Sequence, residues 1–358
     1  MLAYGLFSLV CMSPVFAQTE EPAEVTAPLC EGVGELKPIC DFKSPEDIEV
    51  IPQTKTLLVS QFGGIGVSGG LGAGSLAAYN TETKVKTELF PLNAVAGVGN
   101  WGEKDCKFPG AEFSPHGIHL SKRDSGRLQL LVVNHGGRES VEFFEVLMEE
   151  GAPRLSWRGC VEFPKTAFLN DVVALPDLGF VVSHMFTRGS VKAQQIALRG
   201  KGSGYVYQWY PRLGIQAVPG TYGALPNGLQ VSKDGQYLFI NMYTGGGIRK
   251  VELATGKVAG RAYMRRPDNS SWLPDGRLLV ASHVGNPIAS QECSDHTIRY
   301  CGLAFKLIAV DPKTMKQEVI FENEGAPMGS ATVGVLLGTT LYMGSFIGDR
   351  ILTAPWLN

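Results

Sequence analysis

The chain has 358 residues, of which 44% are hydrophobic and 18% charged, with a formal net charge of −2. This composition is typical of an ordered globular protein and argues against a disordered chain. It gives no support to nucleic-acid binding, which needs a clustered basic surface. The 44 glycines indicate a chain that turns often, and therefore favour many short strands over long helices.

Residues 1–17 predict a secretory signal peptide. An apolar run over residues 2–10 is followed by Pro14 and a Val15-Phe16-Ala17 end before polar residues, although no lysine or arginine precedes the run. A short buried helix is the alternative. Cys11 lacks the small residues that precede a lipid-modified cysteine, so a lipid anchor is not expected. We therefore expect an exported protein, either periplasmic or secreted.

Six cysteines remain after this segment, at positions 30, 40, 106, 160, 293 and 301. An even number in an exported protein suggests disulfides, but the fifteen connectivities that six cysteines allow stay open. Pairs Cys30–Cys40 and Cys293–Cys301 would close short loops and leave Cys106–Cys160. No cysteine lies in a CxxC or Cys/His pattern, which argues against structural zinc. No later segment is apolar over a length that would span a membrane.

Residues 18–40 form an acidic, proline-containing extension that we expect to be extended or mobile after cleavage. From Pro45 onward, apolar runs alternate with turn signals such as Lys233-Asp234-Gly235 and Pro274-Asp275-Gly276. No amphipathic helix of ordinary length is evident. We therefore expect residues 41–358 to form a single all-β domain.

Four acid or amide doublets recur at the heads of similar segments. They are Glu46-Asp47, Asn170-Asp171, Asn227-Gly228 and Asp268-Asn269. Together with further segment starts near His116 and Gly329, they divide the chain into six units, which predicts a six-bladed β-propeller. If the head of each unit is its innermost strand, the doublets meet at one mouth of the central channel. Converging carboxylate and amide oxygens favour a hard cation, above all calcium.

Short motifs occur once per unit, in a fixed order. They are Glu46-Asp47-Ile48-Glu49-Val50, Ser114-Pro115-His116-Gly117-Ile118, Leu131-Val132-Val133-Asn134-His135, Leu169-Asn170-Asp171-Val172-Val173, Asn227-Gly228-Leu229 with Asp234-Gly235, Asp268-Asn269, and Gly329-Ser330-Ala331-Thr332-Val333. On these motifs the chain resembles the paraoxonases (the arylesterase/lactonase family), from about Cys40 to the C-terminus. The resemblance implies a six-bladed propeller whose central tunnel holds two calcium ions.

The resemblance also implies a role for each matching residue. The catalytic calcium would be held by Glu46, Asn170, Asn227, Asp268 and Asn269. A deeper, structural calcium would be held by Asp47, Asp171 and the backbone carbonyl of Ile118. Each set contains two carboxylates, which suits one divalent ion. Taken singly, each doublet could instead be a turn or strand-edge residue that hydrogen-bonds its own backbone.

His116 matches the family's proposed catalytic histidine, and His135 matches the second member of its dyad. His116 would act as general base on a water, while His135 would orient it or relay the proton. Asp268 is a rival base, because a calcium-bound carboxylate could also activate water. Packing or binding roles for both histidines are the alternative. His184 and His283 follow equivalent strands and are expected to line the pocket.

The expected activity is calcium-dependent hydrolysis of lactones or aryl esters, which are small-molecule substrates. The chain has no Gly-x-Ser-x-Gly elbow, and the glycine run Gly63–Gly74 lacks the Lys-Ser/Thr ending of a phosphate loop. Alternatives are a single-metal sugar lactonase and a non-hydrolytic propeller, either strictosidine-synthase-like or a calcium-stabilised binding module. The sequence does not indicate the natural substrate or the oligomeric state.

Three features depart from the better-known animal paraoxonases. Ser183 stands beside His184 where those members have an acidic residue, and the C-terminal end lacks their ring-closing cysteine. Closure is therefore expected to rest on strand pairing. The loops Asn100–Lys107 and Arg188–Gly204 are distinctive, and substrate choice is expected to reside in them.

Overall fold

The structure is a computed structural model that describes residue 1 and residues 30–64, 72–93, 95–286, 293 and 298–356. The expected signal peptide and most of the extension at 18–40 lie outside these ranges, as do residues 65–71 of the glycine run. Within the described ranges, no helix has the length and apolar character needed to cross a bilayer.

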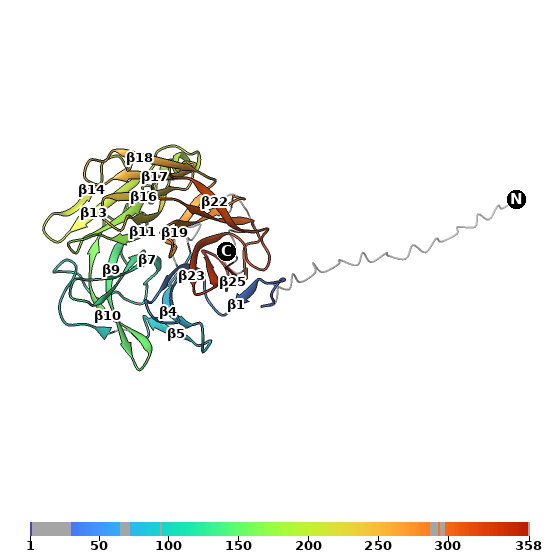
Figure 1. Cartoon of the computed structure of the whole chain (residues 1–358), viewed down its shortest axis with the longest axis horizontal. Coiled ribbons are helices and arrows are strands. Elements are labelled where there is room, and N and C mark those ends of the chain that lie inside the picture. Colours follow the sequence, from blue (N-terminus) through green and yellow to red (C-terminus); the bar gives the residue numbers. More distant parts are fainter. Residues whose placement is uncertain (2–29, 65–71, 94, 287–292, 294–297, 357–358) are drawn as a thin grey trace.

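Six antiparallel sheets follow one another along the chain (Figure 1). The first three are β2 (Pro45–Val50), β3 (Thr56–Gln61), β4 (Ser75–Asn80) and β5 (Lys86–Phe90); β7 (Pro115–Lys122), β8 (Leu128–Asn134), β9 (Ser140–Glu149) and β10 (Ala152–Glu162); and β11 (Leu169–Ala174), β12 (Phe180–His184), β13 (Tyr205–Tyr210) and β14 (Gly214–Ala217). The short β6 (Val95–Ala96) adds to β10 in parallel.

The remaining sheets are β15 (Pro226–Val231), β16 (Tyr237–Met242), β17 (Gly247–Glu252) and β18 (Val258–Tyr263); β19 (Pro267–Trp272), β20 (Leu278–His283), β21 (Phe305–Val310) and β22 (Gln317–Asn323); and β23 (Ala331–Leu337), β24 (Thr340–Ser345), β25 (Ile351–Pro355) and β1 (Lys37–Ile39). The strands β2, β7, β11, β15, β19 and β23 contact one another in sequence, and β2 contacts both β7 and β23. They therefore form a closed inner ring, and the predicted six-bladed β-propeller is confirmed.

The last blade takes its outer strand from the N-terminal side of the chain. β1 pairs antiparallel with β25, with Lys37 opposite Thr353, and the Thr353 hydroxyl donates to the Lys37 carbonyl at 2.8 Å. The sheet thus includes residues that precede position 41. The pairing covers the outer edge of β25 and gives the last blade four strands, with β1 as its outer strand.

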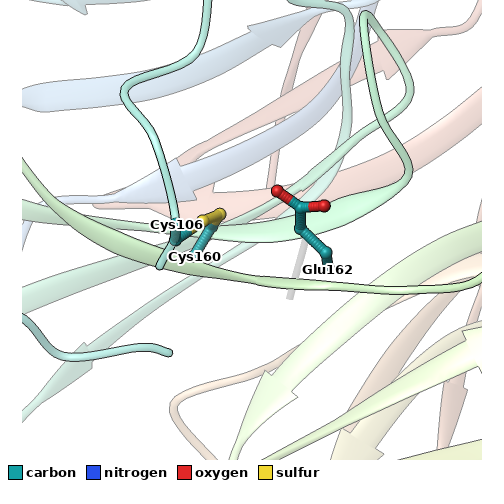
Figure 2. A group of neighbouring side chains, drawn as sticks. All are labelled: Cys106, Cys160 and Glu162. Atoms are coloured by element: carbon teal, nitrogen blue, oxygen red, sulfur yellow. A yellow bond between two sulfur atoms is a disulfide. The ribbon is translucent and has the colours of Figure 1, made fainter. Parts of the chain in front are cut away.

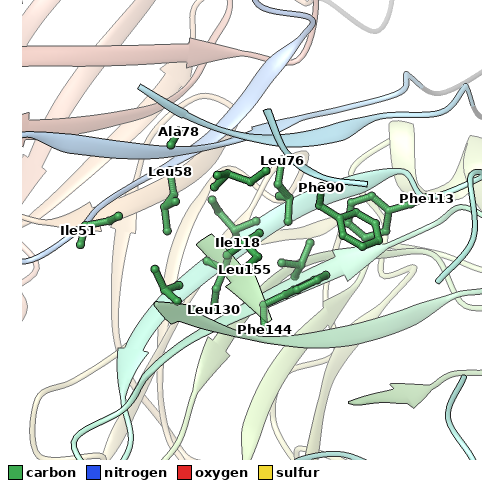
Figure 3. Packing of buried hydrophobic residues seen from close by; sticks show 13 residues of the cluster. Ile51, Leu58, Leu76, Ala78, Phe90, Phe113, Ile118, Leu130, Phe144 and Leu155 are labelled. Carbon is green, nitrogen blue, oxygen red and sulfur yellow. The ribbon is translucent and has the colours of Figure 1, made fainter. Parts of the chain in front are cut away.

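Six apolar clusters lie between neighbouring blades and hold the ring together. The first joins blades one and two, with Leu58 and Phe90 packed against Leu130 and Phe144 (Figure 3). The next residue, Leu131, belongs instead to the cluster between blades two and three. Because successive strand residues point to opposite faces, each sheet is apolar on both sides and is covered by both neighbours.

The one helix in the described part of the chain is α1 (Val191–Leu198), between β12 and β13. Its N-cap is Ser190, whose hydroxyl accepts from the Ala193 N–H at 3.2 Å, and only Ala197 on it is buried. This short helix lies within the loop Arg188–Gly204, which the sequence singles out as distinctive.

Three disulfides join Cys30 to Cys40, Cys106 to Cys160, and Cys293 to Cys301. Of the connectivities left open by the sequence, this is the one in which Cys30–Cys40 and Cys293–Cys301 close short loops and Cys106 pairs with Cys160. The Cys106–Cys160 bridge lies beside Glu162 (Figure 2). Since its two sulfur atoms are bonded to each other, they do not offer thiolates to a metal.

Candidate metal centre and active site

All six inner strands have a register irregularity near their first residues. The pairing shifts between Pro45 and Asp47 on β2, and equivalent shifts occur at the starts of β7, β11, β15, β19 and β23. A β-bulge re-aims the side chains beside it. On the four strands that carry doublets, β2, β11, β15 and β19, the shift falls on the doublet and turns its side chains towards the tunnel axis rather than along a regular pleat.

Four of the five predicted ligands of the catalytic ion contact one another in two pairs. The Asn269 amide donates to Glu46 Oε1 at 2.8 Å, and the Asn227 amide bonds to the Asp268 carboxylate. Asn170 Nδ2 lies 3.3 Å from His116 Nε2, and His116 Nε2 in turn lies 3.6 Å from Glu46 Oε1. Asn170 thus joins the group through His116. All five side chains are buried.

Several of these side chains have oxygen atoms that lack a partner. Among the described residues, Glu46 Oε2 and the Oδ1 atoms of Asn170, Asn227 and Asn269 are buried without a hydrogen bond. Leaving such atoms unpaired costs about 1–3 kcal/mol each. Four unpaired oxygens on four of the six inner strands fit a hard cation that takes carboxylate and amide ligands.

The deeper pair, Asp47 and Asp171, has a different environment. Asp47 Oδ2 accepts from the Ile118 N–H at 2.7 Å, and Asp171 Oδ2 accepts from the Leu229 N–H at 2.6 Å. Each carboxylate therefore fastens its own blade to the next inner strand. Its remaining lone pairs can serve a cation, and Ile118, whose carbonyl is the third predicted ligand, lies directly beside Asp47.

Glycines keep the space beside these carboxylates open. A Cβ atom added to Gly117 would lie 2.7 Å from Asp171 Oδ1 and 2.6 Å from the Asn170 carbonyl oxygen. A Cβ added to Gly228, at the equivalent place on β15, would lie 2.4 Å from the Asp268 carbonyl oxygen. Any side chain here would push neighbouring inner strands apart.

The buried carboxylates repel one another. Burial raises the pKa of Glu46 well above its ordinary range, and Asp47, Asp268 and Asp171 add to the rise. Burial likewise raises the pKa of Asp47 to about 7 and that of Asp268 to about 8. Among the described ion pairs none joins these groups to a lysine or arginine. Four buried carboxylates with no basic partner fit two divalent cations.

The tunnel continues beyond Asp47 and Asp171, towards the ends of the inner strands. A cavity of about 250 Å³ is lined there by both aspartates together with Glu49, His119 and Trp272, among others. Burial raises the pKa of Glu49 to about 8, with Asp47 adding to the rise. The deeper pair of carboxylates therefore lies between the mouth and this cavity.

The two predicted catalytic histidines are in direct contact. His116 Nδ1 lies 2.8 Å from His135 Nε2, and both rings are buried. Phe62 stacks on His116, with ring centroids 4.4 Å apart. Burial lowers the pKa of His116 well below its ordinary value, and the charges of His135 and Arg188 lower it further. A neutral imidazole at the mouth can accept a proton.

Two residues that sequence reasoning missed complete this group. Both carboxylate oxygens of Glu139 lie 3.1 Å from His135 Nδ1, and Arg188 Nη2 donates to Glu139 Oε2 at 2.6 Å. Glu139 follows His135 by four residues, but only the tight turn from β8 to β9 brings its side chain back. Arg188 comes from the next blade, so no local pattern could have found it.

His184 and His283, which are expected to line the pocket, are both buried. The His184 Nδ1 atom accepts from the Phe168 N–H at 3.1 Å. His283 Nδ1 lies 2.8 Å from the Tyr243 hydroxyl, and its Nε2 lies 2.9 Å from the Ala331 carbonyl oxygen and 3.6 Å from Asp268. Both rings are held by such contacts. The Ser183 hydroxyl accepts from the Asp171 N–H at 3.0 Å, so it supports the deeper pair.

The chain is similar to known proteins in sequence profile and in fold. The profile of the arylesterase family matches residues 43–352. None of the curated protein sequences compared with the chain matches it. Similar solved structures include a gluconolactonase from Xanthomonas campestris, at 15% identity and a TM-score of 0.51, covering 90% of this chain and 89% of that one.

Two further structures have the same kind of likeness. They are the calcium-binding protein regucalcin from Agrobacterium tumefaciens, at 13% identity, 88% and 91% coverage and a TM-score of 0.50, and a luciferin-regenerating enzyme, at 12% identity, 89% and 93% coverage and a TM-score of 0.54. At these identities the likeness shows a common fold and no more. The family profile, in contrast, spans most of the chain. We conclude that this chain belongs to the arylesterase family, which supports a hydrolase that acts on esters or lactones.

Proposed function

We propose that the protein is a calcium-dependent hydrolase of lactones or aryl esters, with two calcium ions per chain. The observation that carries the proposal is the set of four unpaired buried oxygens on Glu46, Asn170, Asn227 and Asn269, next to His116. With Asp268 these residues would hold the ion at the mouth. Asp47, Asp171 and the Ile118 carbonyl would hold the deeper one.

In this proposal His116 is the general base. The His116 Nε2 atom lies 3.6 Å from Glu46 Oε1, too far for a hydrogen bond, and 3.3 Å from the Asn170 amide nitrogen. A water at the mouth would take the place of this long amide contact on the Nε2 lone pair. Nε2 takes a proton as the water oxygen attacks the substrate carbonyl, and returns it to the leaving oxygen as the ester bond breaks. The chemistry that bound calcium supplies is polarisation of that carbonyl and compensation of its developing negative charge.

A panel of lactones and aryl esters tests the proposal. The purified mature protein is expected to hydrolyse at least one class, to lose that activity in a calcium chelator, and to regain it when calcium is restored. Absence of turnover across the panel, with calcium tightly bound, would leave a calcium-stabilised binding module. The paired Asp47 and Asp171 favour two ions over the single-metal sugar lactonase, and counting bound calcium by atomic spectroscopy separates these readings.

Two substitutions separate His116 from Asp268 as the base. We expect His116→Gln to lower kcat by at least about 100-fold, since general base catalysis contributes on the order of 10²–10⁴, while the bound calcium stays the same. Asp268→Asn is expected to lower the calcium content. If Asp268→Asn instead keeps both ions and loses turnover, and His116→Gln stays active, Asp268 is the base.

A further inference from the structure

The dyad continues beyond its second histidine into a buried ion pair. Glu139 is 4% exposed, and its carboxylate contacts the ring of His135, the guanidinium of Arg188 and the Leu169 N–H, the last at 2.7 Å from Oε1. Leu169 immediately precedes Asn170 on β11. One carboxylate therefore contacts both the dyad and the inner strand that carries ligands of both predicted ions.

The hydrogen-bonding capacities of these groups determine where the ring protons lie. An ionised carboxylate only accepts, so His135 Nδ1, which faces both Glu139 oxygens, carries the hydrogen. His135 Nε2 is then the acceptor, and His116 Nδ1, 2.8 Å away, is the donor. The same assignment leaves His116 Nε2 without a hydrogen, which fits its 3.3 Å contact with the Asn170 amide, a donor. This nitrogen can then take a proton from water.

Arg188 stabilises this arrangement from outside. Its Nη2 atom lies 2.6 Å from Glu139 Oε2 and 3.0 Å from His135 Nδ1, and its guanidinium lies over the Phe168 ring at 4.7 Å from the centroid. The shorter contact is a charge-assisted hydrogen bond and holds the Glu139 carboxylate in place. In the alternative arrangement His135 Nδ1 would carry no hydrogen and would accept from Arg188 Nη2. Arg188 lies 31% exposed at the start of the loop that contains α1, so it connects the dyad to the rim of the mouth.

We propose that Glu139, held by Arg188, is a positioning residue that fixes the ring tautomers of the His135–His116 dyad. Glu139 has no role in bond making itself. When His116 gains a proton at Nε2, it can pass the Nδ1 proton to His135 Nε2, while the Nδ1–H of His135 keeps its bond to Glu139. The dyad then holds the one proton taken from water, His135 carries the positive charge next to a carboxylate, and no proton passes to Glu139. This inference rests on the proposed function of His116.

Nitrogen NMR of histidine-labelled protein tests the tautomers without any substrate. In the wild type, both His116 and His135 are expected to carry their hydrogen on Nδ1. In Glu139→Gln the amide can donate to His135 Nδ1, so His135 is expected to move towards the Nε2–H form. A wild-type His135 that carries its hydrogen on Nε2 would overturn the proposal, whether or not the protein hydrolyses any member of the panel.

Kinetics of matched variants provide a second test of the positioning role of Glu139. Glu139→Gln is expected to lower kcat on the order of 10²-fold, within the range of general base catalysis, with KM and calcium content unchanged. Glu139→Asp should recover part of that loss, and Arg188→Lys should lose less than Arg188→Met. The control is Glu145→Gln, which removes a buried carboxylate that pairs with Arg127 and Arg158 in the same blade, away from the mouth.

Equal kcat values for Glu139→Gln and the Glu145→Gln control would overturn the proposal. So would an equal fall in Glu139→Gln and Glu139→Asp accompanied by lost calcium, because that outcome marks a structural role. If Glu139→Gln does not fold, the comparison of Arg188→Lys with Arg188→Met and the ring tautomers of the wild type still test the proposal.

Discussion

Glu46 and Asp47 are adjacent on β2, yet their oxygens have different partners. Glu46 bonds to the Asn269 side chain and keeps one oxygen unpaired, whereas Asp47 accepts from two backbone N–H groups, those of Ile48 and Ile118. The unpaired Glu46 oxygen is left available for a ligand at the mouth. The hydrogen bond from Ile118 to Asp47 ties blade one to blade two. We therefore expect Glu46 to serve the proposed site at the mouth and Asp47 to serve the stability of the ring.

Substitution of each residue should separate the two tasks. Asp47→Asn weakens two hydrogen bonds to a charged acceptor, each worth about 1.5–3 kcal/mol, and is expected to lower the unfolding temperature measured by calorimetry in calcium. Glu46→Gln is expected to lower kcat while the unfolding temperature stays closer to the wild type. Equal losses of stability in the two variants would contradict this division.

Gly117 offers a second test at this scale. Gly117→Ala places a methyl group 2.6 Å from the Asn170 carbonyl oxygen and 2.7 Å from Asp171 Oδ1. Because overpacking of this kind typically costs about 1–3 kcal/mol, we expect a lower unfolding temperature and weaker calcium binding by titration calorimetry. Gly126→Ala, at a surface turn, is the control for added volume, although its positive φ brings strain of its own. Full calcium affinity in Gly117→Ala would contradict the expected crowding of the deeper pair.

At the scale of elements, each inner strand combines a bulge at its start with a regular apolar run behind it. The apolar run packs against both neighbouring blades and so fixes the strand. The bulge then turns the polar doublet towards the axis. The alternating pattern and the turns predict the strands themselves, but the bulges follow from how the strands pair.

Blade one has a polar network on its outer strands that makes its stability depend on pH. Although burial alone raises the pKa of Glu88, hydrogen bonds from Gln61, Lys86 and Ser75 lower it below its ordinary value on balance. The native state therefore holds the ionised form more tightly than the unfolded chain. This contribution is present above the ordinary glutamate pKa of about 4.3 and is lost as pH falls through the lower native value.

Glu88→Gln should accordingly have a lower unfolding temperature than the wild type at pH 7. The difference between the two proteins is expected to shrink as pH falls below about 4. Glu82→Gln, an exposed carboxylate in the same blade, is the control and should show no such convergence. Both proteins are measured in a calcium chelator, so that loss of metal at low pH does not affect the comparison. A difference in unfolding temperature that stays constant across the pH range would refute the assignment of this pH dependence to Glu88.

At the scale of the whole molecule, β1 pairs with β25 and completes the last blade, while four buried carboxylates lie near the axis of the ring. Four mutually repelling carboxylates cost free energy without a counter-charge, so we expect calcium to stabilise the ring. A ligand at 100 times its Kd adds about 2.7 kcal/mol to the free energy of unfolding. Removal of calcium by a chelator should lower the unfolding temperature, and restored calcium, more than magnesium, should recover it. An unfolding temperature that does not change with calcium would contradict both proposed calcium sites.

The repeat of doublets, apolar runs and turns determined the all-β class, the number of units and the strands that line the tunnel, because strand periodicity and turn chemistry are local. Tertiary structure alone decided that β1 completes the last blade and that Glu139 and Arg188 complete the dyad. Strand pairing at the edge and contact across blades depend on residues far apart in sequence, such as Lys37 with Thr353 and Glu139 with Arg188. No local pattern encodes them; they exist only once six blades pack into a ring.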